Sequence, residues 1–144
     1  MSYAGVLATV NLYTAQKDEL TSEISDIMME ITSASKQTTQ ISEDYSDARK
    51  DAKESFKDES LTNREAFYEG YSDATEYEQA ILDDLKSDYE CKLANVNDWE
   101  AELEAKKQTL QTEVQAASAT LESYTSVLKS NIKRDFTYGK GTSG

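Results

Sequence analysis

Apolar residues recur every three and four positions through the first third of the chain. Taking Tyr3 as position a of a heptad, thirteen of the fifteen a and d positions up to Ala52 are apolar or aromatic, and Lys17 and Thr38 are the exceptions. A repeat sustained over seven heptads predicts a helix with one narrow apolar seam, as in coiled coils. The sequence contains no Pro to interrupt such a helix. We therefore expect a first helix over about 3–58.

A second apolar stripe runs through the last third of the chain. It keeps the same spacing over residues 93–128, apart from Glu100 and Lys107, and then moves to four-residue steps at Ile132 and Phe136. Asn131 falls on a d position of this stripe, where a polar residue often fixes the register of a coiled coil at a cost in stability. The stripe predicts a second long helix able to pair with the first.

Two capping-box patterns suggest where the later helices begin. Thr62 with Glu65, and Asn97 with Glu100, each place a capping side chain three residues before a Glu. They predict a second helix over about 63–95 and a third over about 98–136. Because the signal near Asn97 is weak, residues 63–136 forming one continuous helix remains an alternative.

These patterns predict an all-α fold: an elongated helical hairpin, or antiparallel coiled coil, of two to three long helices. We expect a single elongated domain over 1–136, with the terminal helices 3–41 and 98–136 paired and an acidic helical head over 43–95. Three of the five glycines lie in 137–144. This composition predicts a flexible, disordered tail.

Charge divides the chain into parts. The sequence has 144 residues, 15 basic and 28 acidic, for a net charge of −13. Residues 43–92 hold seven basic and sixteen acidic side chains, whereas 31–42 and 108–128 hold only one and two charged residues. Helix faces rich in Ser, Thr, Gln and Ala can approach another helix without desolvating ions. We therefore expect the terminal helices to lie between neighbouring copies; the alternative is that these faces are simply solvated.

The composition excludes many kinds of catalytic site. The chain has no His, one Cys and no Gly-rich phosphate loop, which removes imidazole acid–base chemistry, His metal ligands and thiolate zinc sites. Asp44, Asp47 and Asp51 share a helix face without a loop to enclose a cation. We expect no enzyme activity, no cofactor and no metal.

The N-terminal sequence suggests where the chain is made. Residues 1–10 lack the basic residues that begin a secretory signal, and no stretch is apolar enough for a membrane span. We expect a chain that is cytoplasmic as synthesised, with export lacking a cleaved signal left open. Its acidity also argues against nucleic-acid partners.

Assembly is the first functional hypothesis. We expect a structural protein, the protomer of a self-assembling helical filament or similar homo-oligomer, with its neutral terminal helices buried and its acidic middle displayed. In layout this resembles the filament subunits of bacterial secretion and flagellar systems. The expected assembly interface is Val6, Val10, Tyr13, Leu20, Ile24, Ile27, Ile31, Leu110, Val114, Leu121, Leu128 and Ile132.

The second hypothesis is a soluble coiled-coil adaptor or secretion chaperone. It would bind another protein through Phe67, Tyr68, Tyr71 and Tyr77, which are interleaved with acidic residues. Tyr is favoured at interfaces because it offers a large amphipathic surface with few rotatable bonds. The competing interpretation is that the head packs against the first helix through Phe67, Tyr71, Ala74, Ile81 and Leu85. A third hypothesis, a chain that is largely disordered alone, follows from the low content of Leu, Ile, Val and Phe.

Overall fold

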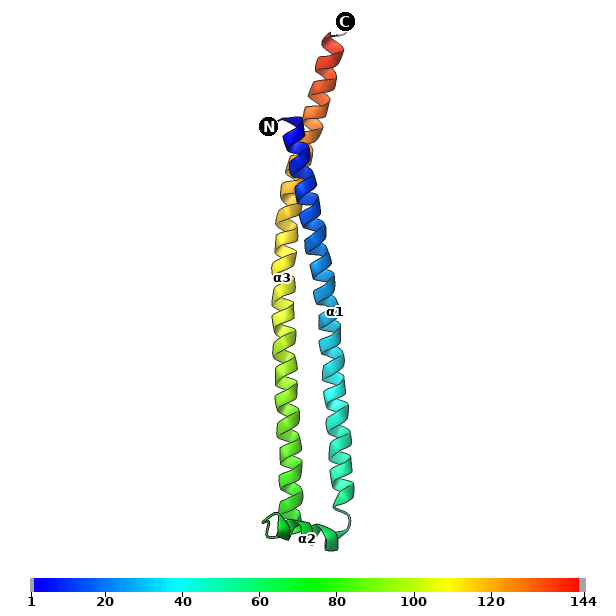
Figure 1. Ribbon diagram of the computed structural model, residues 1–144, viewed down its shortest axis with the longest axis vertical. Helices are drawn as coiled ribbons and strands as arrows, with labels where there is room; N and C mark the ends of the chain where they lie inside the picture. Colours follow the sequence, from blue (N-terminus) through cyan, green and yellow to red (C-terminus); the bar gives the residue numbers. More distant parts are fainter. Residues whose placement is uncertain (1, 143–144) are drawn as a thin grey trace. The chain divides into compact units, whose positions relative to one another are not determined.

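The computed structural model describes residues 2–142, and side chains as far as Arg134. The described residues form three helices, α1 (Tyr3–Ser55), α2 (Glu59–Tyr68) and α3 (Ala74–Thr142), and include no strand (Figure 1). The predicted all-α class is confirmed.

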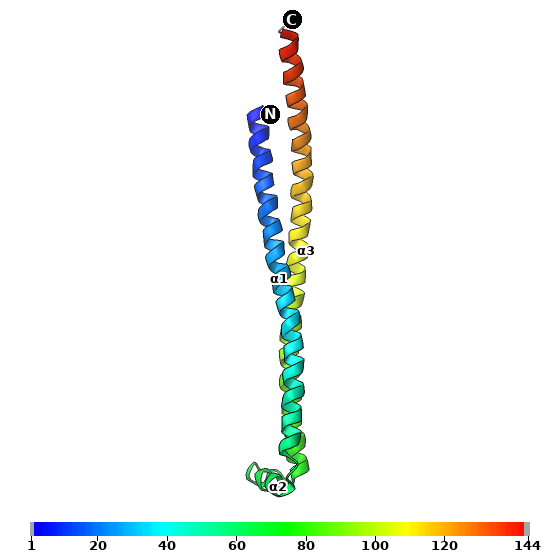
Figure 2. The same ribbon diagram turned by 90° about the vertical axis from the view of Figure 1, so that its right-hand side faces the viewer.

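The helices divide between two compact units. Unit 1 comprises Met1–Glu30 and Leu103–Gly144, and unit 2 comprises Ile31–Glu102. Each unit contains part of α1 packed against part of α3 (Figures 1 and 2).

The two helices run antiparallel within each unit. In unit 1, the ring of Tyr13 stacks on that of Tyr124 with centroids 6.0 Å apart, and further along, Ile27 shares a surface hollow with Leu110. In unit 2, Tyr45 stacks on Tyr89 at 4.4 Å, and Phe56 meets Tyr77 edge-on at 5.6 Å. In both units, a later residue of α1 contacts an earlier residue of α3.

Burial along α1 follows the heptad. Every a and d position from Val6 to Ala52 is buried or half-buried, and only Tyr3 is exposed, at 44%. At all other positions of the helix, except Gly5 and Thr9, the residue is exposed. The apolar period therefore identifies the packed side of the helix, and Lys17 lies on that side half-buried.

Burial along α3 follows the second stripe. Leu103 and Ala117 are buried, and the interrupting residues Glu100 and Lys107 are half-buried. The ammonium group of Lys107 lies 3.1 Å from the carboxylate of Glu104, which partners the charge. Asn131 is 8% exposed, and its Nδ2 has no hydrogen-bond partner. The polar residue at this d position is therefore buried.

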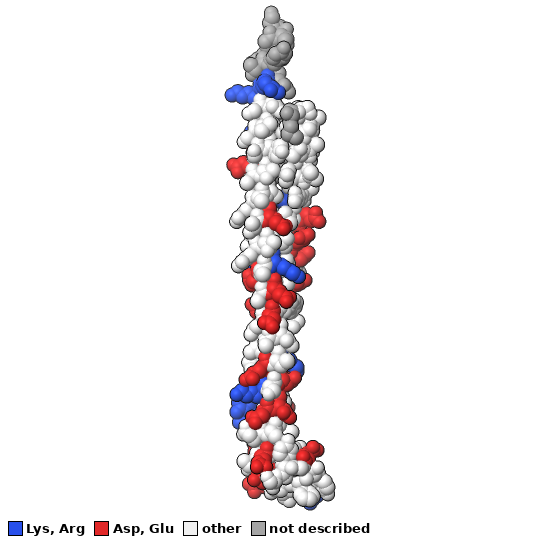
Figure 3. All heavy atoms as spheres, turned by 90° about the vertical axis from the view of Figure 1, so that its left-hand side faces the viewer, with Lys and Arg blue, Asp and Glu red and all other residues white. Residues whose placement is uncertain are grey.

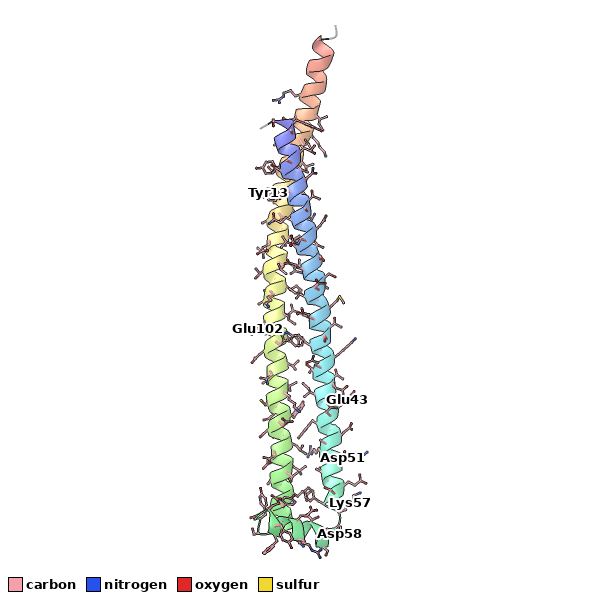
Figure 4. The ribbon with its side chains drawn as sticks, in the orientation of Figure 1. Tyr13, Glu43, Asp51, Lys57, Asp58 and Glu102 are labelled. Carbon is pink, nitrogen blue, oxygen red and sulfur yellow. The ribbon has the colours of Figure 1, made fainter. Side chains whose placement is uncertain are left out.

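The end of α1 and the start of α2 differ from the predicted boundaries. α1 ends at Ser55, three residues before the predicted end at 58. Asp58 caps the start of α2 (Figure 4). Its Oδ1 accepts hydrogen bonds from the backbone N–H groups of Ser60 and Leu61 at 3.1 and 3.4 Å. Thr62, the predicted cap, lies inside α2 with 1% exposure, and its hydroxyl donates to the backbone oxygen of Asp58 at 2.7 Å. The predicted cap was therefore wrong by four residues.

Gly70 ends α2. Its φ of +86° is the left-handed conformation that favours Gly, its N–H donates to Phe67 O at 3.2 Å, and the N–H of Tyr71 donates to Ala66 O at 2.8 Å. This pair of bonds is a Schellman motif. Three residues later Asp73 caps α3, with its Oδ1 accepting from the N–H of Glu76 at 2.8 Å.

The predicted boundary at 95–98 was wrong. Asn97 and Glu100 lie inside α3, and the break between the second and third helices falls at 69–73. The backbone of α3 continues to Thr142, so most of the predicted flexible tail, 137–144, is helical; its last two residues lie outside the described part of the chain.

Candidate interaction surfaces

The residues of the expected assembly interface lie mostly within the seams of the single chain. Val6 and Leu20 are buried, and Ile132 is 49% exposed. The other nine are half-buried: Val10, Tyr13, Ile24, Ile27, Ile31, Leu110, Val114, Leu121 and Leu128. Much of their apolar surface is thus already covered by the chain's own helices.

An uncharged face lies on the outside of α1 in unit 1. It consists of positions that recur at helical spacing beside the seam, it is exposed throughout, and Asp18 is its only charged residue. We call it the neutral face: Ala4, Leu7, Ala8, Asn11, Thr14, Ala15, Asp18, Thr21, Ser22, Ser25, Met28 and Met29. The opposite exposed side carries Glu19, Glu23, Asp26 and Glu30.

Threonine hydroxyls on this face are already hydrogen-bonded within the helix. Thr14 donates to Val10 O and Thr21 to Lys17 O, both at 2.7 Å. The same i−4 bond recurs on α3 at Thr112 and Thr120. Because these hydroxyls have backbone partners, covering them leaves no donor unsatisfied.

The neutral face also carries large apolar side chains. Leu7 is 37% exposed, Met28 54% and Met29 69%. None of them occupies an a or d position, so the seam pattern alone did not identify them. The sequence signal that could have identified them is a large apolar residue outside the a and d positions of the heptad.

Charge differs sharply between the two units. Residues 31–102 carry 8 basic and 19 acidic side chains, whereas the rest of the chain carries 7 and 9. The net charges are therefore −11 for unit 2 and −2 for unit 1. On the face shown in Figure 3, Asp and Glu side chains cover more of the surface than Lys and Arg do.

The surface of α2 exposes three large apolar side chains. Phe67 is 77% exposed, Tyr68 78% and Leu61 53%, and the rings of Phe67 and Tyr68 meet at 6.0 Å. We call these three residues the α2 patch. Ala66 and Thr62 cover the inner side of the helix, each with 1% exposure. The structure therefore presents Phe67 outward, rather than packing it against α1.

Tyr71 and Tyr77 behave differently from the other two predicted partner-surface residues. Their rings pack together at 5.4 Å, and the half-buried Tyr77 also meets Phe56. Burial first, and then the carboxylates of Glu65 and Glu69, raises the pKa of Tyr77 above its ordinary 10.0. Tyr77 is thus chiefly part of the packing of unit 2, whereas Tyr71 remains 37% exposed.

Basic side chains in unit 2 gather near the end of α1. Arg49, Lys50, Lys53 and Lys57 line an open surface hollow together with Tyr45, Ser46 and Glu54. On α3, Lys92 forms an ion pair with Asp88 at 2.9 Å, and this hydrogen bond is the main cause that raises the pKa of Lys92. Both partners are largely exposed, so the pair contributes little to stability.

The described residues contain no group of three or more Cys, Asp or Glu side chains placed to hold a metal ion. Cys91 is a free, exposed thiol. None of the helices in the described range has a stretch long and apolar enough to cross a membrane.

Comparisons of the chain with protein-family models, with curated proteins and with solved structures found no match.

Proposed function

We propose that this chain is a non-enzymatic structural protein, the protomer of a homo-oligomer such as a helical filament. In this proposal each protomer is a helical hairpin, its neutral face lies against neighbouring copies, and its acidic residues 31–102 are displayed. The observation that carries the proposal is the neutral face: twelve exposed positions on α1 with one charge among them.

Desolvation favours the burial of this face. Burying Met28 and Met29 removes apolar area from water. Thr14 and Thr21 keep their backbone hydrogen bonds when covered. Only Asp18 would bring a charge into the contact, and one charge can lie at the rim of an interface, where it stays solvated.

Charge repulsion supports the same arrangement. A net charge of −11 over residues 31–102 disfavours close contact between those parts of two copies, and salt screens it over about 10 Å. Contacts through the weakly charged unit 1 avoid this cost. Association through the neutral face should therefore be unchanged or strengthened as salt rises.

The mass of the protein across a wide concentration range tests the proposal. Light scattering should show mass that grows with concentration, with rods or sheets in negative-stain micrographs of the same samples. A small fixed mass at every concentration would contradict open assembly. Circular dichroism on the dilute chain shows whether a single copy is helical. A strongly helical spectrum would contradict the hypothesis that the chain is largely disordered alone.

A matched pair of substitutions locates the contact. Ser25→Glu places a charge on the neutral face, and Ser33→Glu makes the same change on the side of α1 that carries Glu19 and Asp26. Ser25→Glu should weaken association by ~10-fold or more, because the charge must be desolvated. Ser33→Glu should leave association unchanged. Equal effects of the two substitutions would contradict the assignment.

Substitutions in the seam cannot make this distinction. Ile27→Asp is expected to abolish assembly, but Ile27 is half-buried where α1 meets α3 in unit 1. A charge there also disrupts the chain's own packing. The exposed Ser25 separates assembly from folding.

The second candidate function is an adaptor or secretion chaperone. The exposure of Phe67 and Tyr68 favours it, because largely exposed aromatic rings are typical anchors of protein contacts. This candidate predicts a closed oligomer of constant mass. It also predicts that Ser25→Glu has no effect on that mass.

A further inference from the structure

We propose that the α2 patch of one copy binds residues 127–134 of α3 in a second copy. We call residues 127–134 the basic stretch. The inference rests on the proposed function, because it takes the partner to be another copy of this chain. It adds a second contact, distinct from the neutral face, between unlike surfaces.

The α2 patch combines exposed apolar side chains with negative charge. Leu61, Phe67 and Tyr68 are each more than half exposed. Residues 58–73 around them contain five acidic side chains and one basic side chain, Arg64. An acidic surface with aromatic anchors fits a partner that is both basic and apolar.

The basic stretch has the opposite character. Lys129, Lys133 and Arg134 are exposed, and residues 127–134 include no acidic side chain. Val127 is 41% exposed and Ile132 49%. Three basic and two accessible aliphatic side chains thus lie on one short segment of helix.

The two surfaces complement each other group by group. Guanidinium and ammonium groups can pair with the carboxylates of Glu65 and Glu69, and they are also attracted to the faces of aromatic rings. Ile132 offers an aliphatic side chain that can cover Phe67. Such a contact would bury apolar area at its centre and leave the charged pairs at its rim.

The other basic group in the chain fits less well. Arg49, Lys50 and Lys53 near the end of α1 are interleaved with Asp47, Asp51 and Glu54, so that group has little net charge. Contact between two α2 patches would bring like charges together. The same argument disfavours anionic membranes at the α2 patch.

The contact has a consequence for assembly. It joins two different surfaces, so every copy can offer one surface and accept the other. Heterologous contacts of this kind extend into an open chain unless the rotation closes a ring.

Paired charge reversals test the contact. One variant carries Glu65→Lys and Glu69→Lys in α2, and the other carries Lys129→Glu and Arg134→Glu in the basic stretch. All four side chains are exposed, and circular dichroism verifies that each variant folds. Each variant alone should associate ~10-fold or more weakly than the parent chain in sedimentation velocity at low salt.

Mixing the two variants is the decisive step. In an equimolar mixture each reversed surface meets a complementary one on the other variant, so association should recover to within ~3-fold of the parent chain. A fluorophore on Cys91, the only cysteine and an exposed one, reports mixed complexes. If the variants associate as the parent does, or if the mixture does not recover, the inference is overturned.

A control variant and salt separate this contact from the neutral face. Lys50→Glu with Lys53→Glu makes the same kind of reversal on α1 and should leave association unchanged. Raising the salt concentration should weaken the α2 contact, whereas the neutral-face contact should not weaken. If the parent chain assembles and the charge reversals do nothing, only this inference fails. If the charge reversals weaken association but Ser25→Glu does not, the assignment of the neutral face as an interface between copies is incorrect.

Discussion

The ring of Tyr45 stacks on the ring of Tyr89, with centroids 4.4 Å apart and planes inclined by 15°. Both residues are half-buried, and the hydroxyl of Tyr89 lies 3.5 Å from that of Ser42. The stack joins α1 to α3 inside unit 2. A shift of either helix along the other would separate the rings, so the stack sets their alignment in this unit.

Removing one ring of the stack should destabilise the protein. We expect Tyr89→Ala to lower the free energy of unfolding by about 1–3 kcal/mol, because it removes aromatic contact and part-buried apolar area. Tyr68→Ala, a change of the same size at a position 78% exposed, should cost under ~0.5 kcal/mol. Urea titrations followed by circular dichroism measure both. Similar losses would show that the stack contributes nothing specific.

The left-handed conformation of Gly70 should make it intolerant of a side chain. Gly70→Ala would place a Cβ in open space, but at a φ of +86°, so strain should destabilise the α2–α3 connection by about 1 kcal/mol. Gly5→Ala, inside a helix, should be neutral or stabilising by up to ~1 kcal/mol. Hydrogen exchange of residues 58–76 should quicken only in Gly70→Ala. Unchanged exchange there would contradict the prediction.

Replacing the covered amide of Asn131 tests whether it lacks a partner. In the isolated chain Nδ2 is unsatisfied, so Asn131→Leu should raise the free energy of unfolding by about 1–2 kcal/mol. The exposed Asn97→Leu serves as the control and should change it by less than ~0.5 kcal/mol. A thermal melt on dilute protein measures the difference. Destabilisation would mean that the amide is hydrogen-bonded after all.

The raised pKa of Tyr77 predicts a loss of stability in alkali. Burial and the nearby Glu65 and Glu69 disfavour its ionised form in the folded chain. The stabilisation that follows is fully present below the unfolded pKa and is lost as pH rises through the folded pKa. Melting temperatures should therefore fall less steeply above about pH 10 in Tyr77→Phe than in the parent chain. Equal slopes in Tyr77→Phe and the parent chain would contradict the prediction.

The sequence was sufficient to predict the packed side of both long helices. Periodicity alone located positions such as Leu20 and Leu103, which the structure buries. It could do so because a helix presents a/d positions to whatever it packs against, regardless of the partner. Among the polar residues at a/d positions, Lys17 is half-buried and Asn131 is buried.

Helix boundaries were predicted less well, because capping patterns are short and recur by chance. Thr62 and Asn97 both fit a capping box, yet both lie inside helices. The effective cap of α3 was present in the sequence as Asp73 followed by Glu76. The Gly at position 70, a few residues before it, was the additional signal that a helix ends there.

The candidate interaction surfaces depended on information that periodicity does not contain. Tyr77 was grouped with Phe67 and Tyr68 by composition, but its ring contacts with Phe56 and Tyr71 place it in the packing of unit 2. Which aromatic rings of a short helix face water depends on how that helix docks. Here the docking side is defined by Ala66 and Thr62, two small residues that carry little hydrophobic signal.

The closed connections on both sides of α2 have a thermodynamic consequence for whatever binds there. Asp58 caps the start of the helix and Gly70 closes its end, and the side-chain oxygen of Asn63 accepts a hydrogen bond from the N–H of Ala74 at 3.2 Å. The backbone beneath Phe67 and Tyr68 is thus ordered when the chain folds. When a partner binds these rings, the α2 backbone loses little further conformational entropy. Ordering of this backbone therefore reduces the partner's affinity less than it would in a flexible segment.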